Sequence, residues 1–222
     1  MTTAVAAARA GAPPAVICAV PAEARALRRL GSLAVVHVGG IGARPAARAA
    51  AAALRDRPAA LLCAGFCGAA DPSLRAGDLV AAEEVVDGAT GRSFAADPAL
   101  LAAAPGRRGR LTTLPRMATD PRVKLAVGGL AVDMESAAVA AVAADAGVPF
   151  LALRAVSDTA GQRLPALGTA IDAEGRLRAG AAARHLARRP REIAMLARIA
   201  PASMRAGRAL SAGLVQTLGG VA

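Results

Sequence analysis

Val132-Asp133-Met134-Glu135-Ser136 ends an apolar run and leads directly into an alanine-rich segment typical of a helix. A second apolar run, from Phe150 to Val156, ends in Ser157-Asp158. In an open α/β sheet, ligands bind outside the carboxyl ends of the strands. We therefore expect the acids at these two strand ends to meet over one small molecule.

The order of the remaining segments predicts a single α/β domain with a mixed sheet, because apolar runs that read as buried strands alternate with helical segments. Near the C-terminus, Pro201 separates two expected amphipathic helices, residues 191–199 and 203–218. We expect a disordered alanine-rich leader at residues 1–13 and one domain over residues 14–222. The expected strands include residues 15–20, 33–38, 59–64, 130–133 and 150–156.

Two glycine-containing segments follow the second and third expected strands. They are Gly39-Gly40-Ile41-Gly42 and Gly65-Phe66-Cys67-Gly68. A glycine turn between a strand and a helix lets the backbone approach a ligand closely. Two such turns at successive strand ends indicate one pocket seen from two sides, and tight turns without a ligand remain the alternative.

The charge of the chain does not point to nucleic acid. The formal net charge is +11, but the basic residues are scattered arginines, with Lys124 as the single lysine. Aromatic residues make up only 1% of the chain, so it lacks the stacking platforms that single-strand binding uses. We expect a solvated basic surface and no nucleic-acid partner.

The cysteines and the hydropathy exclude further classes. Cys18, Cys63 and Cys67 have no metal-binding spacing, so we expect buried reduced thiols and no metal. The sequence holds no uninterrupted apolar span of membrane-crossing length and no ordered signal-peptide regions. We expect a cytoplasmic protein without an integral membrane span, and peripheral membrane association stays open.

A set of short motifs, in this order and spacing, resembles the nucleoside phosphorylase and nucleosidase family. Within that family the chain is most similar to methylthioadenosine/S-adenosylhomocysteine nucleosidases and hopanoid-associated phosphorylases, over roughly Ala15 to Ala160. The ordered set is specific, although no single member is. Its members are Val20-x-x-Glu23, Gly39-Gly-Ile-Gly42, Ala64-Gly-Phe-Cys-Gly68, Arg75-Ala-Gly-Asp-Leu79, Val132-Asp-Met-Glu-Ser136 and Arg154-Ala-Val-Ser-Asp158.

The resemblance implies a three-layer α/β/α fold around a mixed, partly barrel-like sheet, and cleavage of an N-glycosidic bond. It implies that Asp158 protonates the purine and that Glu23 activates water. It further implies that Glu135 binds the ribose hydroxyls, that Met134 packs beside the sugar, and that Arg154 helps to hold the water. From the residues alone, Glu23 reads more often as a solvated residue in the first turn of a helix.

Further candidate substrate-binding residues are Asp133, Ser157, Gly65, Phe66 and Met117. The resemblance offers no match here for the aromatic residue that stacks on adenine in many relatives. Base affinity is therefore expected to rest on Met117, Phe66 and backbone contacts.

The chemistry of the reaction divides the roles of the acids. Breaking the bond between ribose and adenine builds positive charge on the sugar and negative charge on the base, so a carboxylate and a proton donor both lower the barrier. One acid must stay ionised while another holds a proton. We expect Asp158, at the mouth of an apolar strand, to hold the proton, and Glu135, at a helix start, to stay anionic.

Two positions depart from the phosphorylase pattern. The family's phosphorylases hold phosphate with an arginine and a serine where this chain has Cys63 and Phe66. This favours water as the nucleophile and no cofactor, with phosphorolysis as the alternative. We expect a small-molecule nucleoside as the partner and, by analogy, a homodimer.

No motif in the sequence identifies the 5′ substituent of the substrate, which could be a methylthio group, a homocysteine or a hopane skeleton. Two other classes of function stay open: a non-catalytic nucleoside-binding protein on the same fold, and nucleic-acid binding.

Overall fold

One eight-stranded mixed sheet organises the computed structural model, which describes residues 12–220. Residues 1–11 of the expected leader lie outside the described residues. The strands are β1 (Ala15–Cys18), β2 (Val35–Val38), β3 (Leu61–Ala69), β4 (Leu79–Asp87), β5 (Ser93–Ala95), β6 (Arg107–Thr113), β7 (Ala131–Asp133) and β8 (Phe150–Asp158).

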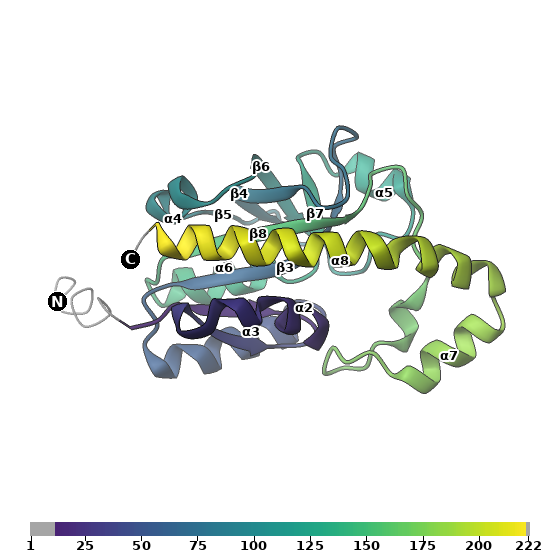
Figure 1. Ribbon diagram of the computed structural model, residues 1–222, viewed down its shortest axis with the longest axis horizontal. Coiled ribbons are helices and arrows are strands. Elements are labelled where there is room, and N and C mark those ends of the chain that lie inside the picture. Colours follow the sequence, from purple (N-terminus) through teal and green to yellow (C-terminus); the bar gives the residue numbers. More distant parts are fainter. Residues whose placement is uncertain (1–11, 221–222) are drawn as a thin grey trace.

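Helices cover both faces of the sheet, as Figure 1 shows, and the longest, α8, lies along one face. Short 3-10 turns occupy Leu27–Leu33, Leu54–Asp56 and Leu167–Ala170. The α-helices are α2 (Pro21–Ala26), α3 (Ala43–Ala53), α4 (Pro98–Ala103), α5 (Pro121–Ala126), α6 (Ser136–Asp145), α7 (Ala179–Ala187) and α8 (Pro190–Gly219).

Alternation along β3 divides the core into two layers. Leu61 and Cys63 point into a cluster with the alanines of α3 and α6. Leu62 and Ala64 point the other way, into a cluster with the leucines of α8. Successive residues of a strand face opposite sides of the sheet, so an unbroken apolar strand must be covered on both faces. This accounts for the three layers.

Five strands close on themselves. β3 pairs with β7, β7 with β6, β6 with β4, β4 with β8, and β8 with β3 again. β1 and β2 extend this ring from β3, and β5 extends it from β4. The predicted α/β class with a mixed, partly barrel-like sheet is therefore confirmed.

The predicted turn at Gly65–Gly68 is wrong, because these residues continue β3. Their backbone pairs with β8, with Gly65 opposite Arg154, and a bulge between Cys67 and Gly68 brings Gly68 opposite Asp158. The glycines serve close approach by side chains. A Cβ on Gly65 would lie 2.5 Å from Glu23 Oε1, and one on Gly68 would lie 3.0 Å from Asp158 Oδ2.

The predicted break at Pro201 is also wrong, because α8 continues through it. Pro201 is exposed, and the missing N–H costs one helical hydrogen bond. Beyond it, Ala206, Leu210, Leu214 and Leu218 recur every four residues and are buried against the sheet. Packing along this stripe outweighs the local preference of proline.

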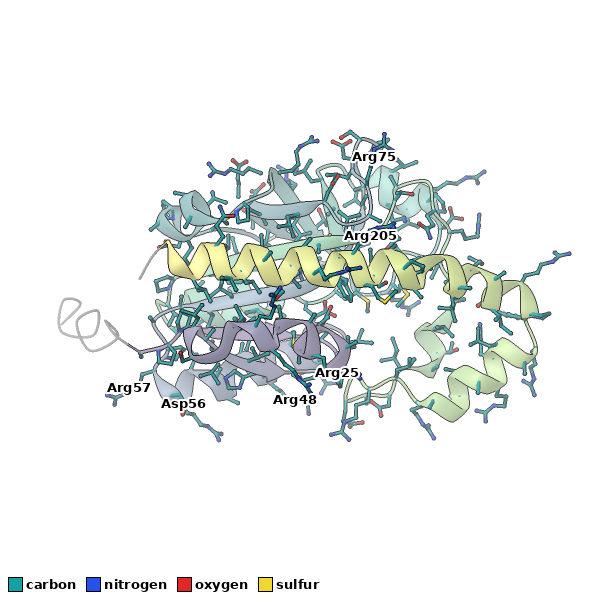
Figure 2. The ribbon with its side chains drawn as sticks, in the orientation of Figure 1. Arg25, Arg48, Asp56, Arg57, Arg75 and Arg205 are labelled. Carbon is teal, nitrogen blue, oxygen red and sulfur yellow. The ribbon has the colours of Figure 1, made fainter. Side chains whose placement is uncertain are left out.

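The surface carries dispersed basic side chains. Figure 2 labels exposed arginines on separate parts of the chain, including Arg25 on α2, Arg48 on α3 and Arg205 on α8. Cys18, Cys63 and Cys67 are buried free thiols. Among the described residues, no helix combines the length and apolar character needed to cross a bilayer.

Candidate active site

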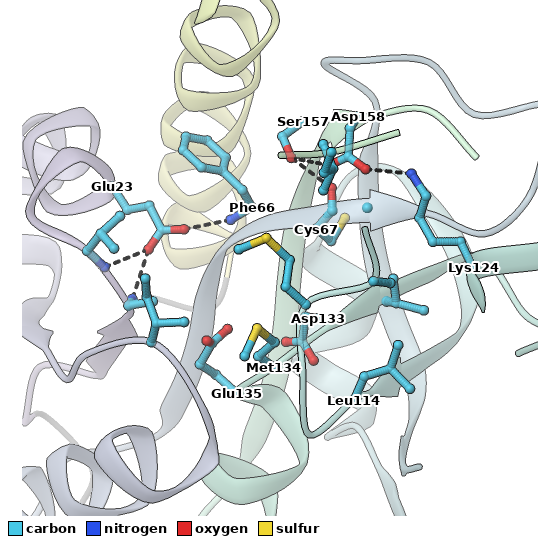
Figure 3. A pocket seen from close by; sticks show the side chains of 18 residues that line it. Glu23, Phe66, Cys67, Leu114, Lys124, Asp133, Met134, Glu135, Ser157 and Asp158 are labelled. Atoms are coloured by element: carbon cyan, nitrogen blue, oxygen red, sulfur yellow. Dashed lines mark hydrogen bonds and ion pairs between the residues drawn. The ribbon is translucent and has the colours of Figure 1, made fainter. Parts of the chain in front are cut away.

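A cavity of about 240 Å³ lies where β3, β7 and β8 approach their carboxyl ends. Figure 3 shows carboxylates from three parts of the chain around it: Glu23 from α2, Asp133 and Glu135 from the end of β7, and Asp158 from the end of β8. Convergent polar groups in a concave pocket are the usual mark of a binding site. The two strand ends singled out in the sequence thus meet at one cavity.

Most of the predicted site residues line this cavity, and two do not. Gly65 and Arg154 lie behind its wall, where Arg154 is 1% exposed. The ring of Phe66 also borders a second cavity, of about 420 Å³, between α2 and α8. The predicted residues on the cavity wall are Glu23, Phe66, Met117, Asp133, Met134, Glu135, Ser157 and Asp158.

Backbone N–H groups fix the Glu23 carboxylate at the cavity. Its Oε2 accepts hydrogen bonds from Ala19 and Val20, at 2.8 and 3.1 Å, and its Oε1 accepts one from the Phe66 N–H at 2.8 Å. Pro21 begins the short helix that carries it, a favoured position for proline. Glu23 is therefore a buried, oriented acid and not the solvated first-turn residue of the alternative interpretation.

The Arg154 guanidinium, on β8, is the charged centre behind the wall. Its shortest contact is an ion pair with Asp133, and its Nη2 also lies 3.4 Å from Glu135 Oε2. Nη2 donates to the Ser136 hydroxyl at 3.1 Å as well. Burial alone lowers the pKa of Arg154, but the neighbouring anionic groups, Asp133 foremost, raise it well above its ordinary value.

The Glu135 carboxyl is held by the Gly39–Gly42 segment, because its Oε1 accepts a hydrogen bond from the Gly42 N–H at 2.8 Å. Burial raises the pKa of Glu135 from 4.5 to about 7, Arg154 opposes this, and the Asp133 charge adds to it. Burial therefore opposes the anionic state that is expected for Glu135. Its place at a helix start contributes less than the loss of solvent around it.

The Asp158 side chain is paired with a buried cation. Its Oδ2 accepts a hydrogen bond from Lys124 Nζ at 2.7 Å, within a buried ion pair, and its Oδ1 lies 2.7 Å from the Ser157 hydroxyl. The residue expected to hold the proton for the purine therefore contacts the Lys124 ammonium group directly.

Lys124 is a charged residue of the cavity wall that the sequence analysis did not predict. It is completely buried on α5, while its neighbours Val123 and Leu125 are 46% and 49% exposed. This pattern is the reverse of that expected for an amphipathic helix. The available signal was that Lys124 is the single lysine of a chain whose other basic residues are arginines.

Comparisons with known proteins identify the family of the chain. A family model described as the phosphorylase superfamily matches residues 26–189. A 5'-methylthioadenosine/S-adenosylhomocysteine nucleosidase from Geobacillus kaustophilus is 36% identical over 137 residues, a match that covers 48% of this chain. The chain spans 58% of the length of that relative.

Solved structures share the fold. A 5'-methylthioadenosine/S-adenosylhomocysteine nucleosidase from Colwellia psychrerythraea, solved with adenine, has a TM-score of 0.70 at 22% identity, covering 94% of this chain and 95% of the other. A futalosine hydrolase from Helicobacter pylori also has a TM-score of 0.70, at 15% identity, covering 94% and 98%. At such identities the likeness is one of fold.

We predict that Arg154→Met lowers the free energy of unfolding by about 3–5 kcal/mol, because it leaves Asp133 and Glu135 buried without their cation. Urea unfolding followed by circular dichroism measures this. The matched control is Arg110→Met, which breaks an exposed pair with Glu84 and should cost much less, because solvent screens exposed ion pairs. Equal losses in the two variants would contradict the central role of Arg154.

We predict that Glu135 makes the folded protein less stable as the pH rises from 4.5 to 7. The folded state raises the pKa of this carboxyl and so binds its proton more tightly than the unfolded chain does. Its contribution to stability is fully present below pH 4.5 and is lost as the pH rises through 7. Urea unfolding at several pH values should show this slope in the wild type relative to Glu135→Gln.

The control for this pH dependence has the opposite sign. The hydrogen bond from Arg110 lowers the pKa of Glu84, so the contribution of Glu84 is lost as the pH falls. Compared with Glu84→Gln, the wild type should therefore lose stability towards acid. A Glu135→Gln variant whose stability follows the wild type across this range would refute the assignment.

Proposed function

The chain belongs to the phosphorylase superfamily, and from that premise we propose that it is an enzyme that releases adenine from a 5′-substituted nucleoside by cleaving the N-glycosidic bond. The observation that carries the proposal is that Glu23, Glu135 and Asp158 line one cavity. The curated relative at 36% identity, named as a nucleosidase, supports the same reaction class.

In this proposal the three acids act on different parts of the substrate. Glu135, beside Met134, binds the ribose hydroxyls and stabilises the positive charge that builds on the sugar. Glu23, held by three N–H groups, accepts a proton from the attacking water. Asp158 faces the departing base. Arg154 acts from behind the wall, where it holds Asp133 and Glu135 in place.

We propose water and not phosphate as the nucleophile. Four carboxyl groups line the cavity, from Glu23, Asp133, Glu135 and Asp158, and Lys124 is the single Lys or Arg side chain among the described residues of its wall. Lys124 is already paired with Asp158. A phosphate ion would enter a site without an uncommitted cation, which disfavours phosphorolysis. Phosphate-dependent cleavage and non-catalytic nucleoside binding are the alternatives that the assay below separates.

The 5′ substituent is proposed to be apolar, with adenosylhopane, an intermediate of hopanoid biosynthesis, as the first candidate and methylthioadenosine or S-adenosylhomocysteine as the others. Apolar side chains from Val20, Ile41 and Leu164 contribute to the cavity wall. A volume of about 240 Å³ suits a nucleoside and not a polycyclic tail, so a hopane skeleton would lie outside the mouth. The exposed Leu177, Ile193 and Met204 provide apolar surface on the C-terminal third of the chain.

We further propose a cytoplasmic homodimer. Val123 and Leu125 on α5 are about half exposed, directly beside the buried Lys124 of the cavity wall, and a partner copy would cover them. Light scattering after gel filtration should give twice the chain mass. Val123→Glu with Leu125→Glu should then give the monomer, and a dimer unaffected by both changes would exclude α5 from the interface.

The decisive assay for the reaction measures adenine release from methylthioadenosine, S-adenosylhomocysteine and adenosylhopane, each with and without phosphate. We expect release that does not depend on phosphate. Glu23→Gln and Asp158→Asn should each lower kcat about a hundredfold or more, the scale for losing an acid–base group, and thermal unfolding checks that both variants fold.

Glu83→Gln is the matched control for these variants, because this acid on β4 is exposed and should leave kcat unchanged. Adenine release that needs phosphate would replace hydrolysis by phosphorolysis. Nucleoside binding without any adenine release would favour the binding protein over the enzyme.

A further inference from the structure

The Lys124 ammonium has one acceptor for each of its three protons. Nζ donates to Asp158 Oδ2 at 2.7 Å, to the Thr159 carbonyl at 2.6 Å and to the Gln162 carbonyl at 2.9 Å. The side chain is completely buried, and it lines the candidate active site. An ammonium group has three N–H donors, a number that matches these three acceptors.

The surroundings of Asp158 accommodate both of its protonation states. The Ser157 hydroxyl carries one proton and has two acceptors within reach, Asp158 Oδ1 at 2.7 Å and the Cys67 carbonyl at 3.2 Å. It can donate to an ionised Asp158, or turn to Cys67 and accept from a protonated Asp158. Figure 3 shows Lys124, Asp158 and Ser157 in one row along the cavity wall.

Three titratable groups near Asp158 are poor proton sources, and Glu135, whose pKa burial raises to about 7, is bonded to Gly42 and Arg154 and not to Asp158. Burial raises the pKa of the Cys67 thiol, on β3, so it stays neutral and holds its proton tightly. Asp133, on β7, is paired with Arg154. At the exposed start of α5, Asp120 lies 3.6 Å from Arg163. Among the described residues, Lys124 is the one charged donor bonded to Asp158.

We propose that Lys124 supplies the proton that the departing adenine receives, and that it acts through Asp158. This inference rests on the proposed function. As the bond between C1′ and the base nitrogen breaks, its electron pair leaves with the base. The Asp158 carboxylate takes a proton from Lys124 Nζ and passes it to adenine, which leaves Lys124 as a neutral amine and Asp158 ionised again. Water attacks C1′ and gives its proton to Glu23, and solvent exchange afterwards returns a proton from Glu23 to Lys124.

The geometry fits the product of this transfer as well as its start. After Lys124 gives up the proton aimed at Asp158, its amine keeps two N–H groups, and the carbonyls of Thr159 and Gln162 are there to accept them. The lysine therefore stays in position in both charge states. Since it reaches the substrate through another group, Lys124 is a positioning residue that also holds the proton.

The single lysine gives a direct test in the unmodified protein. Labelling with ¹³C-lysine produces one side-chain Cε signal, whose chemical shift follows the charge of Lys124. We expect this signal to titrate at the same pH as the alkaline limb of kcat/KM for adenine release, because that limb reports the essential acid of the free enzyme. A lysine that stays charged across the whole limb would overturn the proposal.

Two variants provide a second test. Lys124→Arg keeps a cation on Asp158 that does not release its proton, so kcat should fall about a hundredfold or more with KM little changed. Lys124→Met removes the cation and lets the buried Asp158 hold a proton of its own. At pH 5.5 the Met variant should therefore be faster than the Arg variant, whereas a purely structural ion pair predicts the opposite order.

The controls separate this inference from the proposed function. Arg122→Gln, at an exposed position on α5, should leave kcat unchanged, and thermal unfolding of both Lys124 variants shows that they fold. If neither folds, the lysine titration in the unmodified protein decides. Wild-type protein that releases no adenine overturns the function and this inference with it. Adenine release with an alkaline limb unrelated to Lys124 overturns the inference alone.

Discussion

The buried guanidinium of Arg154 is the interaction on which the site depends. Arg154 belongs to β8, whereas its partners Asp133, Glu135 and Ser136 belong to the end of β7 and the start of α6. A buried charge of this kind is costly unless its counter-charges are in place. The ring of strands closes through β3, β7 and β8, and Arg154 fixes how the ends of β7 and β8 meet. The position of the cavity follows from that closure.

The Arg154 guanidinium also explains why the carboxyl groups of the cavity differ in the cations that they contact. Asp133 takes the closest place on Arg154, so Glu135 receives only a longer contact, and burial raises the pKa of Glu135. Asp158, on the other side of the cavity, has a cation of its own in Lys124. Two carboxyl groups in one small cavity thus have opposite surroundings, a division of roles that acid–base chemistry requires.

Local patterns predicted the class of fold, and the order of the motifs predicted the family. Both signals can be read from the sequence without knowing how the segments pack. The features that the sequence did not predict depend on contacts between residues that are distant in the sequence. Gly65 and Gly68 read as a turn, yet they are strand residues that make room for Glu23 and Asp158. The state of Glu135 follows from its burial and from Arg154, and neither is visible in its own segment. Similarly, the burial stripe of α8 keeps Pro201 within a helix.

The place of Lys124 in the cavity wall was not predicted from the sequence, for a different reason. Lys124 is the single lysine among 27 lysine and arginine residues, so elsewhere this chain takes arginine wherever a positive charge suffices. On a solvated surface the two residues serve almost equally well, but at a buried site they differ. Arginine presents a planar fork that keeps its proton, whereas lysine presents a compact charge with three donors and shifts its pKa readily when buried. At position 124 three separate acceptors converge on one nitrogen, a geometry that a planar guanidinium does not reproduce. The single lysine of the chain therefore lies at the position in the cavity wall where the geometry suits an ammonium group.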